Sequence, residues 1–214
     1  MKKIISIMML MIISLSVYAN DIYINQSGAT LDLDVLQDGQ NNTIGSSGTA
    51  SSVIGATTNL AITQIGDSNV MTFDVNGATY TGTFSVTGNT NNIDFNCDSG
   101  GTNSSCGTAT ASIVWVGSSN DIDIDIGETS SATSATVGIT GASGSDSNTI
   151  LGTIDGNSAI LTLSINGDTN NFLVDIDGNG DSVGHTYIHT HTGSIADVDI
   201  TQSGIYDNMI TLTT

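Results

Sequence analysis

The chain contains no proline, although it is 214 residues long and 25 of its residues are glycine. Even all-β proteins normally use proline in turns and on edge strands. The complete absence of proline is therefore typical of a chain in which all the backbone N–H donors are used in hydrogen bonds.

Basic side chains are almost as scarce as proline. Lys2 and Lys3 are the only ones besides three histidines, against 21 Asp and Glu residues, and the net charge is −19. From about Asn20 onward the chain has no Lys or Arg. Such a surface repels nucleic acids and anionic lipid head groups, so we expect no nucleic-acid partner. It also implies a need for screening by salt or divalent ions.

The first 19 residues have the features of a secretory signal peptide. Lys2 and Lys3 are followed by a mostly apolar stretch at residues 4–17 and by the sequence Val17-Tyr18-Ala19, which is typical of a cleavage site. The apolar stretch is too short to span a membrane comfortably, and no later segment is long and apolar enough. We therefore predict a leader at 1–19 and a single secreted domain at 20–214, with no membrane insertion of the mature chain.

Cysteine is also rare, with Cys97 and Cys106 as the only two. In an exported chain they are expected to form a disulfide. Closing the flexible loop between them would stabilise the fold by roughly 2–3 kcal/mol in the chain-entropy model. Metal binding by the two thiols is the weaker alternative, because no histidine lies near them in the sequence.

The strongest pattern present is an internal repeat, which occurs in Leu60–Gly77 (LAITQIGDSNVMTFDVNG) and again in Leu161–Gly178 (LTLSINGDTNNFLVDIDG). Apolar residues alternate with polar ones up to a Gly, an Asn follows three residues later, and the alternation then resumes with opposite parity. Opposite parity is what two strands need if the chain reverses between them and both point apolar side chains inward. The repeat residues we assign are Gln26, Gly28, Gln64, Gly66, Asn69, Gly88, Asn91, Gly117, Asn120, Gly167, Asn170, Gln202 and Gly204.

The spacing of these repeats predicts the fold. Gly66 and Gly88 are 22 residues apart, and longer spacings contain low-complexity insertions that we expect to be loops. One unit cannot bury its apolar face alone, so the units should stack about 4.7–4.9 Å apart, with inward amides such as Gln64 bonded along the stack. We predict an all-β fold without helices: a β-solenoid of strand-arc-strand repeats with a minimal period of about 22 residues, preceded by a cleaved signal peptide.

The spacing Gln64-x-Gly66-x-x-Asn69, within a repeat of this length in a secreted, proline-free chain, resembles the curlin repeat of bacterial curli subunits. The first half of the same motif occurs at Gln26-x-Gly28 and Gln202-x-Gly204. The resemblance implies a β-solenoid that is secreted across the outer membrane and assembles on the cell surface into extracellular amyloid fibres, which serve adhesion and the biofilm matrix. It also implies partners: further copies of the chain, an outer-membrane export pore, a nucleating subunit and periplasmic holding factors.

A possible calcium site is the main alternative to a purely structural role. Asp175, Asp177, Asn179, Gly180 and Asp181 match the opening of a calcium loop. The twelfth position would be a threonine instead of a glutamate, and no helices are expected beside it. The same residues suit a solvated strand edge and turn. The alternative function is thus a monomeric acidic β-solenoid that is stabilised by Ca²⁺ and acts as a binding or adhesin module.

The segment HTYIHTH places His185, His189 and His191 on one face of a strand together with Tyr187. Two histidines at i and i+2 are able to bind Zn²⁺ or Cu²⁺. The alternative is a stripe of surface histidines that becomes charged below about pH 6.5.

Two further patterns are compatible with enzymes. Gly180–Gly184 matches G-x-S-x-G, but the nucleophile elbow of hydrolases needs a following helix, and none is predicted. Asp residues alternate in Asn120–Gly127 and Leu31–Val35, and paired carboxylates serve in glycosidases. These carboxylates share one exposed face with no aromatic cleft nearby, so charge that prevents lateral sheet stacking is the simpler explanation. We therefore predict no enzymatic activity and no cofactor.

Overall fold

A computed structural model describes residues 21–39, 42–45, 50–66, 68–88, 91–97, 106–117, 120–127, 134–155, 158–168, 170–177, 185–194, 196–204 and 208–214. The expected leader at 1–19 lies outside these residues. The strands are β1 (Asp21–Ile22), β2 (Asn25–Asp38), β3 (Thr43–Ile44), β4 (Ser51–Ile65), β5 (Val70–Thr87), β6 (Asn92–Cys97), β7 (Cys106–Val116), β8 (Asp121–Ile126), β9 (Ser134–Gly141), β10 (Thr149–Asp155), β11 (Ala159–Asn166), β12 (Asn170–Asp177), β13 (Thr186–Thr192), β14 (Ala196–Gln202) and β15 (Met209–Thr213). The described residues contain no helix.

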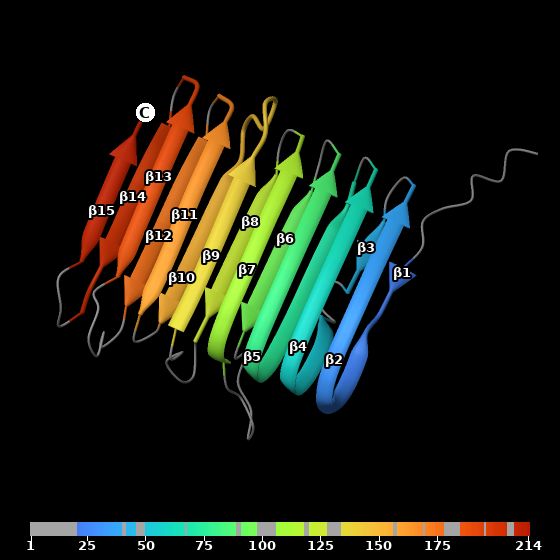
Figure 1. Cartoon of the computed structure of the whole chain (residues 1–214). Helices are drawn as coiled ribbons and strands as arrows, with labels where there is room; N and C mark the ends of the chain where they lie inside the picture. The colour runs from blue at the N-terminus through green and yellow to red at the C-terminus, as the bar shows by residue number, and fades with distance from the viewer. Residues whose placement is uncertain are drawn as a thin grey trace, which may run out of the picture.

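Successive strands stack in parallel and form two ladders that run the length of the molecule (Figure 1). The first ladder contains β1, β3, the beginnings of β2, β4 and β5, and then β6, β8, β10, β12 and β14. The second contains the ends of β2, β4 and β5, and then β7, β9, β11, β13 and β15. The chain alternates between the ladders, so the fold is a parallel β-solenoid, as the repeat predicted. Pairing of Gln64 with Val86 gives the predicted 22-residue spacing.

The long strands β2, β4 and β5 pass through an arc and take part in both ladders. Ser51–Ile54 of β4 pair with Phe73–Asn76 in the first ladder, whereas Thr57–Ile65 pair with Thr79–Thr87 in the second. From β6 onward each turn uses separate strands for the two ladders. We call the passage from the first ladder to the second the Gly-Ala arc, after Gly28-Ala29, Gly55-Ala56 and Gly77-Ala78 in the first three turns. We call the return passage the Asn arc, after its buried asparagines, of which Asn42 is the first.

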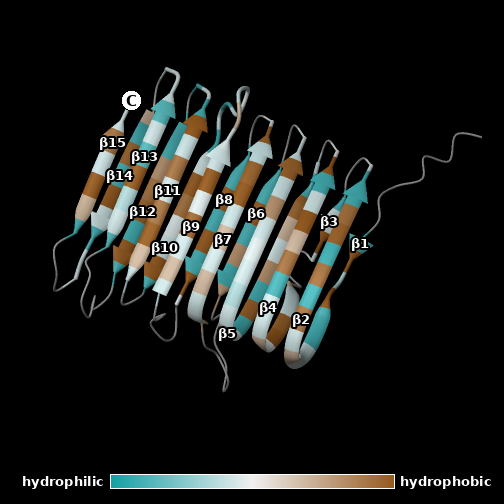
Figure 2. Ribbon diagram, viewed as in Figure 1, coloured by the Kyte–Doolittle hydropathy of each residue, from teal (hydrophilic) through white to brown (hydrophobic). Residues whose placement is uncertain are grey.

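The core lies between the two ladders, and alternate side chains of every interior strand point into it. In β11 and β12 buried and exposed residues alternate without exception, and bands of hydrophobic and hydrophilic residues follow one another along many of the ribbons (Figure 2). Leu161, Leu163 and Ile165 point inward before the Asn arc, and Phe172 and Val174 point inward after it. The change of parity across the arc is therefore confirmed. Each strand buries every second residue. The residues of the arc between Ile165 and Phe172 move the buried positions from odd to even residue numbers.

Large aromatic side chains in the core are accommodated by glycines on neighbouring positions. A Cβ atom on Gly82 would lie 1.8 Å from the hydroxyl oxygen of Tyr80, and one on Gly141 would lie 2.7 Å from Cζ2 of Trp115. Both aromatic side chains are fully buried. Each of these glycines thus leaves space for one particular large neighbour, in a core that has few voids.

The terminal turns differ from the interior ones. Among the described strands β14 pairs only with β12 and β15 only with β13, so each has one free backbone edge, as do β1 and β2 at the other end. The inward-pointing Ile210 and Leu212 remain 50% and 48% exposed. At the first turn Ile22, Ile24 and other inward residues are only partly buried.

Candidate functional site

Six asparagines line the Asn arc in consecutive turns, and all are buried: Asn42, Asn69, Asn91, Asn120, Asn148 and Asn170. From Asn91 onward each amide Nδ2 donates to the Oδ1 of the asparagine in the next turn, at 2.8, 2.9 and 2.9 Å. The same Oδ1 atoms accept backbone N–H groups at 3.1–3.2 Å. Asn91, Asn120, Asn148 and Asn170 therefore form a hydrogen-bonded column along the solenoid axis, whereas Asn42 and Asn69 donate to backbone carbonyls.

A glycine stands three residues before every asparagine of the arc except Asn148, which follows Ser145, and the close approach of stacked turns requires it at several of these positions. A Cβ atom on Gly66 would lie 1.8 Å from the carbonyl oxygen of Gly39, and one on Gly88 would lie 1.8 Å from that of Gly66. Asn120 and Asn170 donate from Nδ2 to the carbonyls of Gly117 and Gly167 at 2.8 and 3.0 Å. These predicted repeat residues thus build the arc, and the structure gives them a packing role.

The inward glutamines also stack, as predicted for Gln64. Its Nε2 donates to Oε1 of Gln37 in the preceding turn at 2.7 Å, and both side chains are buried. Gln37, Gly39 and Asn42 form a complete Q-x-G-x-x-N unit that our sequence assignment missed. The identical spacing was available to find it, but the flanking run of Gln and Asn obscured it.

Two assigned repeat motifs lie half a turn away from the position we expected. Gln26 pairs with Val53 in the first ladder, so Gln26-x-Gly28 enters the Gly-Ala arc. Gln202 pairs with Ile176 in the same ladder, so Gln202-x-Gly204 also lies at that side. Aligning them with Gly66 was therefore wrong. The error arose because both ladders alternate with period two and both arcs use glycine, so a short motif does not tell the arcs apart.

Gln26 and Gln202 nevertheless share one column, at its two ends. The column runs through Gln26, Val53, Val75, Cys97, Ile126, Ile154, Ile176 and Gln202. All its interior side chains are apolar and buried. Both side-chain polar atoms of Gln202 are buried and have no hydrogen-bond partner. The last position of the column thus carries an amide whose hydrogen-bonding groups are unsatisfied.

The predicted disulfide is present. Cys97 and Cys106 are bonded with their Cα atoms 5.7 Å apart, and both are buried. Cys97 ends β6 in the first ladder and Cys106 begins β7 in the second. The bond therefore ties the two ladders together in the first turn in which no continuous strand does so.

The three histidines do lie on one face with Tyr187, but that face points into the core, so the surface stripe we considered is wrong. His185, His189 and His191 are at most 3% exposed. The Tyr187 hydroxyl lies 3.1 Å from Nδ1 of His189, and Nε2 of His191 lies 2.9 Å from the carbonyl oxygen of Gly167. Burial, and to a lesser degree the neighbouring His191, lowers the pKa of His189 to about 4.

These histidines do not form a metal cluster. Within the described ranges no group of three or more His, Cys, Asp or Glu side chains is arranged to hold a metal ion. The sequence context explains the burial, because His189 is paired with Leu163 on one side and with Leu212 on the other. A neutral imidazole fills a position that other turns fill with an aliphatic or aromatic side chain.

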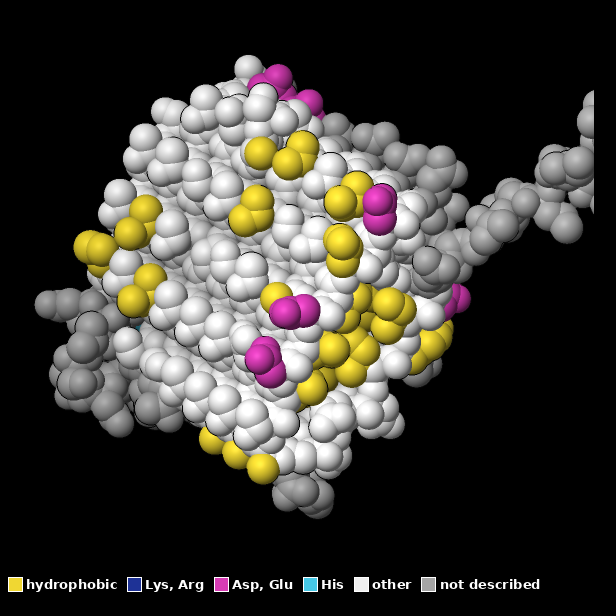
Figure 3. Space-filling model, turned by 45° about the vertical axis from the view of Figure 1, so that its right-hand side comes forward, with side chains coloured by type: hydrophobic (Ala, Val, Ile, Leu, Met, Phe, Trp, Pro, Cys, Tyr) yellow, Lys and Arg dark blue, Asp and Glu magenta, His cyan; other side chains and the backbone are white. Residues whose placement is uncertain are grey.

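Carboxylates gather on the outer surface of the first ladder. Burial raises the pKa of Asp94, and the carboxylates of Asp74, Asp125 and Asp121 raise it further. A shallow hollow of about 370 Å³ on this surface is lined in part by Asp123, Asp125 and Asp175. Figure 3, turned 45° from the view of Figure 1, draws a different face, on the side of the second ladder, where acidic side chains are few and scattered among apolar and uncharged polar ones.

The calcium-loop candidate is only partly described. Asp175 and Asp177 are exposed on the outer side of β12, whereas Asn179 and Asp181 lie outside the described residues. The G-x-S-x-G serine lies outside them too. The Asp residues of β8 point away from the core, as predicted for a charged outer face.

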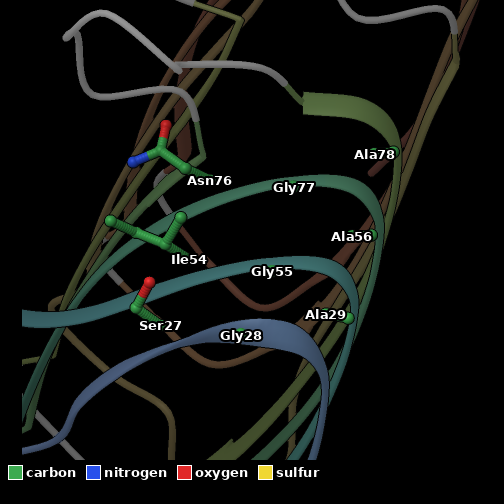
Figure 4. A pocket seen from close by; sticks show the side chains of 9 residues that line it. All are labelled: Ser27, Gly28, Ala29, Ile54, Gly55, Ala56, Asn76, Gly77 and Ala78. Atoms are coloured by element: carbon green, nitrogen blue, oxygen red, sulfur yellow. The ribbon is translucent and has the colours of Figure 1, made fainter.

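A second hollow, of about 480 Å³, follows the outside of the Gly-Ala arc (Figure 4). It is lined by three stacked triplets, Ser27–Ala29, Ile54–Ala56 and Asn76–Ala78. Small side chains dominate it, and none of its lining residues is an acid, a base or a thiol nucleophile.

Comparison of the chain with family models, curated proteins and solved structures finds no match in any of the three. Among the described residues no helix is long and apolar enough to cross a membrane. Two features of the structure itself are candidates for a functional role: the polar columns inside the solenoid and the incompletely buried turns at its two ends.

Proposed function

We propose that the chain is the structural subunit of an extracellular, curli-like amyloid fibre that serves cell adhesion and the biofilm matrix. The observation that carries the proposal is the contrast between interior and terminal turns. Interior strands are paired on both sides and bury their inward side chains, whereas β14 and β15 are paired on one side and leave Ile210 and Leu212 about half exposed. Unpaired strand edges next to exposed apolar side chains are templates for further strands.

The geometry of a parallel stack favours growth along a single axis, that of the solenoid. The two ends of the solenoid are different surfaces, so contact between them is head to tail and does not close on itself. Each added copy presents a new free end. The acidic outer face opposes side-by-side association of the sheets, because like charges repel. Together these features favour long, thin fibres.

Sequence features support the proposed secreted location and partners. The predicted leader at 1–19 supports export, and the resemblance of Gln64-x-Gly66-x-x-Asn69 to the curlin repeat supports an outer-membrane pore and a nucleating subunit as partners. The second motif, Gln37-x-Gly39-x-x-Asn42, strengthens this resemblance. The hydrogen-bonded Asn and Gln columns support it further, since stacked amide columns stabilise cross-β assemblies.

Fibre diffraction and electron microscopy of the purified chain test the proposal. We expect unbranched fibres, thioflavin T fluorescence, and reflections near 4.7–4.8 Å and about 10 Å. Assembly should accelerate with added NaCl, with Ca²⁺ and at lower pH, because each reduces charge repulsion. A chain that sediments as a monomer for days under all these conditions contradicts the proposal.

The second candidate is a monomeric, Ca²⁺-stabilised adhesin or binding module. The match of residues 175–181 to the opening of a calcium loop favours it, together with the exposed carboxylates of Asp175 and Asp177 at the end of β12. The test is the melting temperature in millimolar Ca²⁺, in millimolar Mg²⁺ and in chelator. A rise specific to Ca²⁺ in a chain that stays monomeric supports this function, and equal values in Ca²⁺ and Mg²⁺ contradict it.

A further inference from the structure

The end of the solenoid formed by β14 and β15 carries a specific unsatisfied group as well as apolar surface. Both Nε2 and Oε1 of Gln202 are buried without a partner. Leaving such groups unsatisfied lowers stability. An apolar side chain would fill the same position without that loss, as Ile176 does in the preceding turn. Gln202 lies on β14, which is paired on one side only, so a turn of its side chain toward the free edge brings the amide within reach of a partner in another molecule.

The complementary group lies at the opposite end of the same column. Gln26 is the first residue of the column that Gln202 ends, and six apolar residues separate them. The chain shows what two stacked glutamines do, because Nε2 of Gln64 donates to Oε1 of Gln37 in the adjacent turn at 2.7 Å. Two glutamines stacked at an intermolecular contact would make the same bond.

We infer that Gln202 of one copy pairs with Gln26 of the next, and that this pair fixes the polarity and the register of the contact between copies. The occupant of the β14–β15 end is thus the β1–β2 end of a second copy. This inference rests on the proposed function and specifies its interface.

The rest of the contact agrees with that register. With Gln202 on Gln26, the alternation of β14 and β2 continues across the contact and places Ile200 on Ile24 and Val198 on Ile22. In the second ladder Ile210 meets Leu33 and Leu212 meets Val35, by the column order seen inside the molecule. Val198, Ile200, Ile210 and Leu212, which are incompletely buried at one end, therefore each face an inward apolar side chain that is incompletely buried at the other, whereas Leu31 faces Asn208.

Other arrangements leave the amides unpaired. A slip of two residues along the strand places Gln202 on Ile24 or, in the other direction, on Gly28, and a slip of one residue points it outward. Contact between two β14–β15 ends requires antiparallel strands, and a residue at the end of β14 then faces the beginning of the partner strand. Only the head-to-tail contact in the register described pairs Gln202 with another inward glutamine.

Substitution by leucine tests the pair. Gln202→Leu and Gln26→Leu each leave one glutamine buried against an apolar side chain, so we expect the soluble concentration in equilibrium with fibres to rise about 5- to 30-fold. The double variant removes both amides and should return to within about threefold of the wild-type value. Thr201→Val, on the same strand but pointing outward, is the control and should leave the value unchanged. The chain is expressed with its own leader and assembled after purification under denaturant.

Cysteine substitution tests polarity directly. Paired residues of adjacent parallel strands lie within the Cα separation that a disulfide spans. Fibres of Gln202→Cys alone or of Gln26→Cys alone should give no new covalent dimers on mild oxidation, whereas a mixture of the two should give dimers and the double variant longer ladders. The native Cys97–Cys106 bond stays oxidised throughout.

The outcomes separate this inference from the proposed function. If the wild-type chain forms no fibres, the proposed function fails. If fibres form but the single leucine variants keep the wild-type solubility, or the double variant is no better than either single variant, the glutamine pair is refuted while the fibre function stands. Dimers from Gln202→Cys alone would refute the head-to-tail polarity.

Discussion

Acidification should destabilise the end of the solenoid that contains β13, because His189 is buried there as a neutral imidazole. The side chain is fully buried between Leu163 and Leu212, and its ring centroid lies 4.4 Å from that of Phe172. Tyr187 and His191 are the titratable neighbours that it contacts on its own strand. Adding a proton places a charge in this apolar setting.

The magnitude follows from the pKa of His189. That pKa falls from 6.5 in the unfolded chain to about 4 in the folded one. The stability contributed by the neutral form is fully present above pH 6.5 and is lost as the pH falls towards 4. Between pH 7.5 and pH 4.5 the loss amounts to at most about 2.5 kcal/mol, since one unit of pKa corresponds to about 1.36 kcal/mol.

The assay compares the wild-type chain with His189→Leu. Urea unfolding at low protein concentration is followed by circular dichroism at several pH values, with sedimentation to verify that the protein is monomeric. The slope of stability against pH is the measured quantity, because the variant also loses the Tyr187 hydrogen bond at every pH. Carboxylates that titrate in this range are present in both proteins and cancel in the difference.

The expected result is a wild-type stability that falls by about 2 kcal/mol more than that of the variant between pH 7.5 and pH 4.5. Curves for the two proteins that run parallel within about 0.5 kcal/mol, the order of the extrapolation error, would refute the reasoning.

Three other substitutions test the core and the outer face. Asn120→Ala removes a member of the Asn column and should lower the free energy of unfolding by about 3 kcal/mol. The control is Asn166→Ala at an exposed position, which should change it by less than about 0.5 kcal/mol. Equal effects of the two variants in urea unfolding would show that the column is not a major source of stability. Gly141→Ala should cost about 1–3 kcal/mol and shift the fluorescence of Trp115, the only tryptophan, and an unchanged spectrum with unchanged stability would contradict the packing described. Asp94→Asn should raise the melting temperature at pH 7 and lose that advantage as the pH falls, because a carboxyl group with a raised pKa favours the folded state only when protonated; a melting temperature that does not change at pH 7 would contradict this.

The alternation of apolar residues predicted the solenoid and its inward face correctly, because period two and a parity change leave few other arrangements. It did not distinguish the two arcs, and so it placed Gly28 and Gly204 half a turn away from their positions. Both arcs contain glycine, and the inserted loops differ in length from one repeat to the next. The alternation therefore does not show which of the two arcs a given glycine enters.

The burial of His189 was not predictable for a related reason. The most apolar residue of its own strand, Ile188, lies on the outward face, so hydropathy alone does not say which face points inward. The decision comes from the columns on either side, where Leu163 and Leu212 fix the inward position. Pairing partners distant in the sequence therefore decided what the local segment did not.

The pairing of Gly82 with Tyr80 and of Gly141 with Trp115 has a consequence for any polymer built from this chain. Because these size-matched neighbours occur once each, the interior turns are not interchangeable, and a turn of one copy cannot substitute for another turn of the next. A fibre must then repeat with the length of a whole subunit and not with the spacing of one strand. Such a fibre would therefore show a long axial repeat equal to the length of one subunit, in addition to the strand spacing common to all cross-β fibres.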